Sequence, residues 1–242
     1  NANMSTQPDG VPPTTTMYLW QPIAGTSYAP CVDGDYDMSV IGHEYGHMVE
    51  NRMISKGFRR SGSHAGAMGE SAGDLMAMEY LNEYNFVPVG AGGDNVTRDS
   101  TVSVIGRYAT GNDTHGIRNY DMGFPQAGQY PEGGKYPFVN PLNFSDVGYD
   151  ITGPQVHADG EIWSATNYTL RSLLLDRYPS QGRRIQEECA DGERPAEECP
   201  GNRRWIQLMF DAFVLMPQRP TFLDARDAFL AADVLRFGGA NQ

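Results

Sequence analysis

The amino-acid sequence predicts an α+β fold that is mainly helical, with a short β edge near the N-terminus and a helical C-terminal part. Three observations predict it. Residues 1–37 are rich in Pro, Gly, Thr and Asp around one β-prone patch at residues 17–20. Apolar residues recur at helical spacing from residue 38 onwards, and helical patterns return after Pro154. We therefore expect loops around an edge strand, followed mainly by helices.

The first expected helix covers residues 38–56, where Val40, Ile41, Val49 and Met53 can form one buried side. The Gly- and Ser-rich stretch at residues 57–69 (GFRRSGSHAGAMG) follows, and we expect it to be exposed or mobile. A second helix of about 15 residues is expected over residues 70–84 (ESAGDLMAMEYLNEY).

The region from about residue 85 to 154 consists mostly of Gly, Pro, Asn, Asp and Tyr, with one possible short strand at residues 101–108. A long segment of this composition indicates functional loops. Helices are expected at residues 156–178, 203–216 and 221–236. Thr221 followed by Asp224 is close to a capping box, and Gly238 and Gly239 end the last helix.

Length, charge and hydropathy limit the class of protein. The chain has 242 residues and a net charge of −12, which disfavours binding to nucleic acid. No apolar run approaches the roughly 18 residues that a membrane span needs. An acidic surface is compatible with a secreted protein or a calcium binder. The chain starts at Asn1 without an initiator Met or a signal segment, so we expect that an N-terminal segment has been removed.

The three cysteines predict one disulfide. Cys189 and Cys199 flank a polar, acidic stretch (ECADGERPAEEC), so we expect them to close a short loop. No CxxC motif or Cys/His cluster surrounds them, which disfavours a cysteine zinc site. Cys31 is then free or pairs outside this chain.

Residues 43–47 (HEYGH) carry the main chemical motif. His43 and His47 are one helical turn apart, so both can ligate one zinc ion. Glu44 lies on the same side of the helix, where its carboxylate can reach a zinc-bound water and take its proton. The alternative for this motif is an exposed, His-rich helix face.

A catalytic zinc normally takes three protein ligands plus water. The metzincin continuation is excluded, because Glu50 and Met53 stand where it needs Gly and His. Glu70 and Asp74 are four residues apart on one face of the second helix, so Glu70 can complete a His₂Glu site while Asp74 hydrogen-bonds a ligand histidine. The alternative is a solvated acidic face, but small residues nearby favour a close approach to the first helix.

These segments resemble a known family. HEYGH, GAMGESAGD and VHADGEIWSA look like the thermolysin-like zinc peptidases, and most closely the fungalysins. NANMSTQPDG, MYLW, DGDYD and HGIRNYDM resemble fungalysin segments in the same order, so the likeness spans roughly residues 1–175. The chain departs from most fungalysins at Gly46, where they have Thr, and at Ser71 or Ala72, where they have a bulkier residue.

The resemblance implies a thermolysin-like catalytic domain over residues 1–242, with a metal-helix and loop portion (1–154) and a helical portion (155–242), released from a larger precursor with an N-terminal propeptide. It implies that zinc polarises the scissile carbonyl while Glu44 removes a proton from the bound water and then protonates the departing amine. It makes His157 the donor to the oxyanion. Asp150 is a candidate to orient the His157 imidazole, and Glu161 is the alternative.

Substrate-binding residues also follow from the resemblance. Arg118 matches an arginine that hydrogen-bonds the substrate backbone carbonyl, with a surface salt bridge as its alternative. Asn1 and Ala2 match an edge segment that pairs with an extended peptide. Val40 and Ile117 match residues lining an apolar pocket for the side chain just after the cut.

The main hypothesis is therefore a secreted zinc endopeptidase acting on proteins or peptides, and the alternative is a catalytically silent zinc-binding module of the same fold. Intact Glu44 favours the enzyme. Calcium is a second possible ion, because Asp33, Asp35 and Asp37 form an alternating acidic cluster, although without the remaining positions of an EF-hand loop. His64 and His115 are expected to be exposed loop residues without an assigned role.

Overall fold

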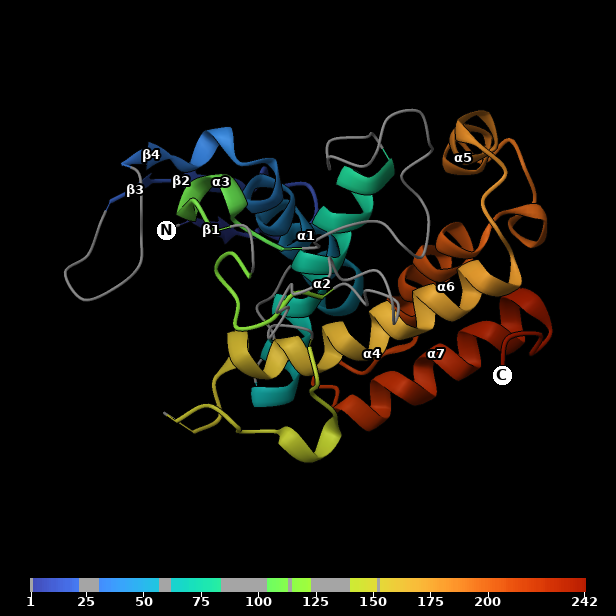
Figure 1. The fold of residues 1–242 in the computed structure, drawn as a ribbon. Coiled ribbons are helices and arrows are strands. Elements are labelled where there is room, and N and C mark those ends of the chain that lie inside the picture. The colour runs from blue at the N-terminus through green and yellow to red at the C-terminus, as the bar shows by residue number, and fades with distance from the viewer. Residues whose placement is uncertain are drawn as a thin grey trace, which may run out of the picture.

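The computed structural model describes residues 2–21, 31–56, 62–83, 104–112, 115–122, 140–151 and 153–242. In these residues the predicted mainly helical fold with a short N-terminal β edge is confirmed (Figure 1). The helices are α1 (Met38–Ser55), α2 (Ser63–Glu83), α3 (Arg107–Thr110), α4 (Val156–Arg177), α5 (Arg183–Ala190), α6 (Gly201–Leu215) and α7 (Phe222–Phe237). Three short 3₁₀ helices are η1 (Gly34–Tyr36), η2 (Phe144–Asp146) and η3 (Ala196–Glu198).

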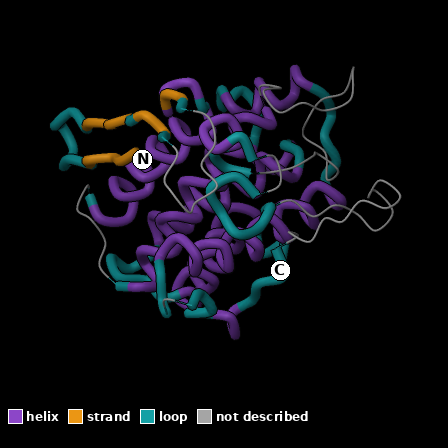
Figure 2. Tube along the Cα trace, turned by 60° about the vertical axis from the view of Figure 1, so that its left-hand side comes forward, coloured by secondary structure: helices purple, strands orange, loops and turns teal. Residues whose placement is uncertain are grey.

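Two small antiparallel sheets form the β edge. β1 (Ala2–Ser5) pairs with β2 (Thr14–Met17), and β3 (Leu19–Trp20) pairs with β4 (Val32–Asp33). Figure 2 shows the strands together at the end of the molecule that carries the N-terminus. Arg52 on α1 donates from Nη2 to the carbonyl of Val11 at 2.8 Å, which fixes the turn of the first hairpin against the helix.

Asp37 begins α1 and joins it to α3. Its carboxylate accepts hydrogen bonds from the backbone N–H of Ser39 at 3.0 Å and of Ala109 at 2.9 Å.

The predicted strand at residues 101–108 is wrong for the part that the structure describes, residues 104–108, which form a turn followed by the start of α3. Gly106 adopts φ 76° and places its N–H on the Ser39 hydroxyl at 2.7 Å, so the chain turns there instead of extending.

Glycine brings α1 and α2 into close contact. A Cβ on Gly46 would lie 2.7 Å from the Cα of Gly73, and a Cβ on Gly73 would lie 2.7 Å from Nδ1 of His43. Any larger residue at these two positions would therefore push the helices apart. The small residues of α2 thus set the distance between the motif on α1 and the acidic residues on α2.

The helix α2 begins earlier than predicted, at Ser63, so residues 63–69 are helical and the expectation of an exposed or mobile connection is wrong there. Ala65, Ala67 and Met68 are buried in the protein interior. Gly160 of α4 packs directly on this turn, because its Cβ would lie 2.9 Å from the Ala67 carbonyl. Packing against α4 thus overrides the low helix propensity of a glycine-rich stretch.

The predicted C-terminal helices form α4, α6 and α7, which enclose the largest hydrophobic core together with α2. Trp163 of α4 stacks on Phe222 of α7 with 5.6 Å between ring centroids, and Figure 1 shows these helices side by side. Thr221 and Asp224 form the expected capping box at the start of α7. None of the helices in the described ranges is both long and apolar enough to cross a membrane.

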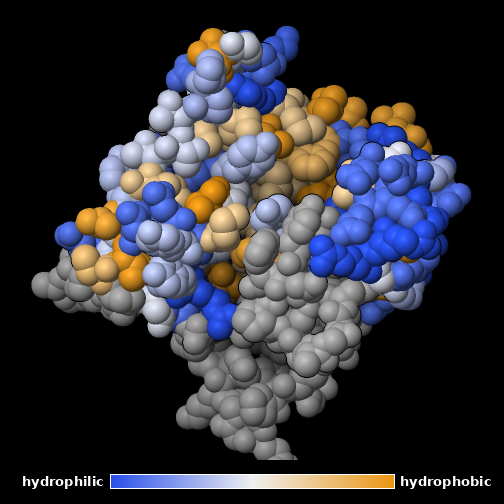
Figure 3. Space-filling model, turned by 90° about the horizontal axis from the view of Figure 1, so that it is seen from above, coloured by the Kyte–Doolittle hydropathy of each residue, from blue (hydrophilic) through white to orange (hydrophobic). Residues whose placement is uncertain are grey.

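An apolar groove of about 350 Å³ lies between α1, α2 and α6. Its lining includes Met38, Ile41, Tyr45 and Val49 along one side of α1. Figure 3 shows the molecule from above, with hydrophobic residues gathered between hydrophilic areas. Ile41 and Val49, which were expected on the buried side of the helix, are thus only partly covered by the described residues.

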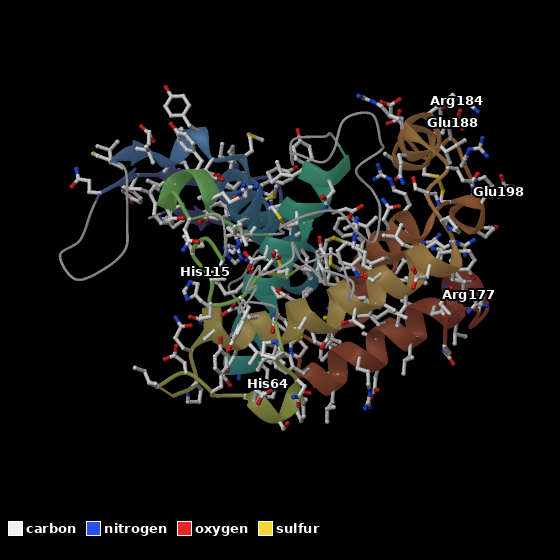
Figure 4. All side chains as sticks on the ribbon, in the orientation of Figure 1. His64, His115, Arg177, Arg184, Glu188 and Glu198 are labelled. Carbon is white, nitrogen blue, oxygen red and sulfur yellow. A yellow bond between two sulfur atoms is a disulfide. The ribbon has the colours of Figure 1, made fainter. Side chains whose placement is uncertain are left out.

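Cys189 and Cys199 are joined by a disulfide, as the sequence predicted. The preceding residues were not expected to be helical, yet they form α5, in which Arg184 pairs with Glu188 at the i, i+4 spacing. Figure 4 shows this charged helix beside the disulfide. Cys31, the remaining cysteine, is exposed and free.

Candidate metal centre

Three side chains meet where α1 crosses α2. His43 and His47 project from one face of α1, and Glu70 projects towards them from α2, with one ligand atom from each lying within 4.8 Å of the others. Nε2 of His43 is 3.4 Å from Glu70 Oε2, and Nε2 of His47 is 3.7 Å from Glu70 Oε1. This is the only such group of potential ligands found in the described part of the chain.

The spacing of these atoms fits a tetrahedral zinc ion. Zinc–ligand distances of about 2.0–2.2 Å place neighbouring ligand atoms about 3.3–3.6 Å apart in a tetrahedron. The two measured separations between histidine nitrogens and the carboxylate are close to this range. The donor set of two imidazoles and one carboxylate also matches catalytic zinc sites, which leave a fourth position open.

The charged groups of the cluster shift one another's pKa values. Burial disfavours a charged imidazole, but the adjacent Asp74 carboxylate outweighs it and raises the pKa of His43 to about 9. Burial and the neighbouring His43 charge lower the pKa of His47 to about 4. Burial alone would raise the pKa of Glu70, but the hydrogen bond from His43 and nearby positive charges lower it. Glu70 is therefore ionised, as a metal ligand must be.

Asp74 supports His43 from the side opposite Glu70. His43 Nδ1 donates to Asp74 Oδ1 at 2.7 Å, which leaves Nε2 to face Glu70. Arg118 donates to the same carboxylate twice, from Nε at 2.7 Å and from Nη2 at 2.8 Å. Burial is outweighed by the charges of Arg118 and His43, which lower the pKa of Asp74. The predicted pair of Glu70 and Asp74 thus lies on one face of α2.

Glu44 is buried beside the cluster, with 6% of its surface exposed. None of the hydrogen bonds formed among the described residues involves its carboxylate, unlike those of Asp74 and Glu161. Burial raises its pKa, the positive charge of His43 opposes that rise, and Glu70 adds to it. Glu44 is therefore a carboxylate with a raised proton affinity and oxygens that are not committed to the fold.

His157 approaches Glu70 from the start of α4. Its Nε2 lies 3.3 Å from Glu70 Oε2, and about half of the side chain is exposed. Burial lowers its pKa, although the Glu70 charge opposes this. Its Nδ1 faces the side-chain amide of Gln155 at 2.7 Å rather than the carboxylate of Asp150 or Glu161.

Glu161 holds together the segments around His157. Its carboxylate accepts hydrogen bonds from the backbone N–H of Asn119 at 2.9 Å and of Tyr120 at 2.8 Å, from the Asn119 side chain, and from the Tyr149 hydroxyl. Four donors therefore occupy the oxygens of the Glu161 carboxylate. Glu161 thus does not orient the His157 imidazole. The carboxylate instead fixes the segment after Arg118 against α4.

A cavity of about 350 Å³ opens between α4 and the Arg118 segment. It is lined by Ile117, Arg118, Asn119, Asp150, Gln155, His157, Ala158 and Glu161. Arg118 and His157 both reach Glu70, so the cavity adjoins the metal ligands.

The other residues expected to bind substrate lie nearby. Val40 is buried in a small core cluster with Trp20 and Ala109, and both Ile117 and Ala2 pack against that cluster. Asn1 lies outside the described residues.

His64 and His115 are not members of the ligand cluster, and the expectation of two exposed loop histidines is wrong, because His64 is partly buried in α2 and His115 is partly buried in a turn. His64 accepts a hydrogen bond from the backbone N–H of Phe222 at 3.4 Å and stacks on that ring, whereas His115 Nδ1 contacts the Arg118 carbonyl at 2.5 Å. Figure 4 shows them in separate segments of the chain.

Among the acidic residues before α1, Asp37 caps that helix and Asp33 accepts a hydrogen bond from the backbone N–H of Asp35.

Comparison with known proteins identifies the family. The family model for fungalysin metallopeptidases (M36) matches residues 1–242. The chain belongs to this family. The predicted resemblance to the fungalysins is thereby confirmed, and so is the thermolysin-like character of a mainly helical domain. A metallopeptidase family implies a metal ion, and the two histidines and Glu70 fit one.

Curated relatives of this fungalysin chain carry related names. It is 33% identical over 249 residues to "Extracellular metalloproteinase mep" from Aspergillus niger, 32% identical over 250 residues to "Extracellular metalloproteinase MEP" from Fusarium vanettenii, and 30% identical over 246 residues to "Extracellular metalloproteinase 2" from Arthroderma otae. Each match covers 100% of this chain but 33% of the relative. The chain therefore spans about a third of the length of these proteins.

Two contacts in this fungalysin site were not predicted from the sequence. Gln155 caps α4 and contacts His157. The signal in the sequence was that Gln155 stands only two positions before His157. The role of Glu161 had no local signal, because Asn119 and Tyr120 are more than 40 positions away along the chain.

Proposed function

We propose that this chain carries the catalytic zinc centre of a secreted endopeptidase, with His43, His47 and Glu70 as the metal ligands. The observation that carries this proposal is the Glu44 carboxylate, which is buried beside the ligand set and makes no hydrogen bond among the described residues. Extracellular relatives support secretion. A silent zinc-binding module would not need such a carboxylate.

Each of the residues at the centre has a separate role in the proposed reaction. When bound, zinc supplies Lewis-acid polarisation of the scissile carbonyl and makes water easier to deprotonate. Glu44 accepts a proton from the attacking water and transfers it to the departing amine, and its raised pKa suits it to both steps. His157 donates from Nε2 to the developing oxyanion. Asp74 keeps the His43 imidazole oriented towards the metal.

The proposed peptide-binding residues surround these groups. Arg118 uses Nε and Nη2 on Asp74, and its Nη1 donates to no residue in the described ranges, so Nη1 is the group that we assign to a substrate carbonyl. Asn1 and Ala2 would pair with an extended peptide along the β edge. Val40 and Ile117 would form the apolar wall of the pocket after the cut. Calcium near Asp33 and Asp35 remains a secondary proposal.

Metal removal tests the proposal. We expect the protein to bind one zinc ion and to hydrolyse an unfolded protein such as casein. A chelator is expected to abolish hydrolysis, and added zinc to restore it. Metal content and cleavage products should be measured on the same sample. Zinc binding without cleavage would favour the module, and cleavage that persists after complete zinc removal would contradict the proposed centre.

Replacing Asp74 by asparagine is expected to weaken zinc binding about 10- to 100-fold. The amide keeps the shape but loses the charge that orients His43 and pairs with Arg118. Affinity would be measured by competition with a coloured chelator. Asp224→Asn is the control, because that carboxylate caps α7 through Thr221 and is not part of the ligand cluster. An unchanged zinc affinity in Asp74→Asn would show that Asp74 positions Arg118 but does not support zinc binding.

A further inference from the structure

The side chain of Gln155 is held by the helix that it begins. Gln155 is the N-cap of α4, with extended backbone angles of φ −135° and ψ 124°. Its Oε1 accepts a hydrogen bond from the backbone N–H of Ala158 at 2.8 Å. A backbone N–H can only donate, so this bond identifies the oxygen end of the amide. The nitrogen end must then point the other way.

The nitrogen end of Gln155 meets His157. Nε2 of the amide lies 2.7 Å from His157 Nδ1. An amide NH₂ group only donates, so Nδ1 must accept and cannot carry a proton in this contact. A neutral imidazole has one proton, which is therefore placed on its own Nε2. The helix cap and the imidazole tautomer are thus connected through a single side chain.

The proton on His157 points into the proposed reaction site. Nε2 of His157 is 3.3 Å from Glu70 Oε2, on the side of the ring that faces the metal ligands. No competing partner takes Nδ1, since among the described residues its hydrogen bond comes from Gln155. Glu161, the alternative partner considered on the same helix, already accepts from four donors. The orientation of the ring therefore depends on Gln155.

We propose that Gln155 is a positioning residue that locks His157 in the neutral Nε2–H tautomer and so aims a hydrogen-bond donor at the substrate carbonyl oxygen. Only the use of that donor rests on the proposed peptidase function. The tautomer itself follows from the cap. A neutral amide orients the ring without adding a negative charge next to the oxyanion, which a carboxylate partner would do.

The tautomer can be read directly by NMR. We expect ¹⁵N-histidine-labelled protein, at a pH where His157 is neutral, to show the proton on Nε2, with the signal assigned by its loss in His157→Gln. Gln155→Thr keeps an oxygen for the cap but has no NH₂ group, so both tautomers should appear. Gln155→Glu has the same length but accepts, so the proton should move to Nδ1. An unchanged Nε2–H signal in Gln155→Glu would overturn the proposal.

Kinetics separate this proposal from the proposed function. We expect Gln155→Thr to lower kcat about tenfold or more with little change in KM, because a misplaced donor affects mainly the transition state. A tautomer shift together with an unchanged kcat would overturn the positioning role. If the parent cleaves no protein but shows the expected tautomers, the peptidase proposal fails while the lock on His157 stands. If the parent cleaves and the tautomers do not respond to Gln155, the inference fails alone.

Discussion

Glu44→Gln is expected to lower the kcat/KM of peptide hydrolysis by about 10²- to 10⁴-fold while zinc stays bound. Glutamine has the shape of glutamate but cannot take a proton. Because the Glu44 carboxylate makes no hydrogen bond among the described residues, its replacement leaves the packing of α1 intact. The loss of activity should therefore come from a slower chemical step rather than from a loss of folded protein.

The measurement compares cleavage of a fluorogenic peptide by the parent and the variant, each with its zinc content determined. Glu187→Gln is a matched control, because that glutamate is half-exposed on α5 and, within the described ranges, its carboxylate pairs with Arg183. Glu187→Gln is expected to retain parent activity. A Glu44→Gln protein that holds one zinc per chain and cleaves within about twofold of the parent rate would exclude Glu44 as the base.

The sequence predicted the helices and the metal cluster for the same reason. Helical periodicity is local, so the spacing of His43 and His47, and of Glu70 and Asp74, already determines which side chains share a face. Runs of apolar residues at helical spacing predicted α1, α4, α6 and α7 in a similar way. The start of α2 was missed, because a glycine-rich turn becomes helical only through packing on α4.

The surroundings of His157 were less accessible to sequence reasoning. The helix start at residue 156 was predicted, but Gln is not among the usual N-cap residues, so its cap and its contact with His157 were not predicted. Glu161 meets Asn119 and Tyr149 through tertiary contacts that no local pattern encodes. The helix α5 was missed as well, because the segment is short and mainly polar, with Ile185 as a buried apolar residue, and it is stabilised here by the disulfide and by charged pairs.

The largest effect on stability is expected at a buried ion pair far from the metal ligands. Arg171 of α4 donates to Glu79 of α2 at 2.6 Å, and their side chains are only 1% and 4% exposed. Asn202 of α6 donates to the other Glu79 oxygen at 2.7 Å and exchanges hydrogen bonds with Gln186 of α5. The Glu79 carboxylate therefore joins α2, α4 and α6, and Asn202 extends the network to α5.

Replacing Arg171 by methionine is expected to lower the free energy of unfolding by about 3–5 kcal/mol, because the Glu79 charge stays buried without its partner. Urea unfolding at one fixed zinc concentration measures this. Arg226→Met is the control: its contact with Asp227 has the same 2.6 Å distance, but those side chains are 58% and 63% exposed, so a loss below about 1 kcal/mol is expected. Adding Glu79→Met to Arg171→Met should recover part of the loss. A double variant as unstable as the single one would show that packing of the arginine, rather than the stranded charge, determines the stability of this junction.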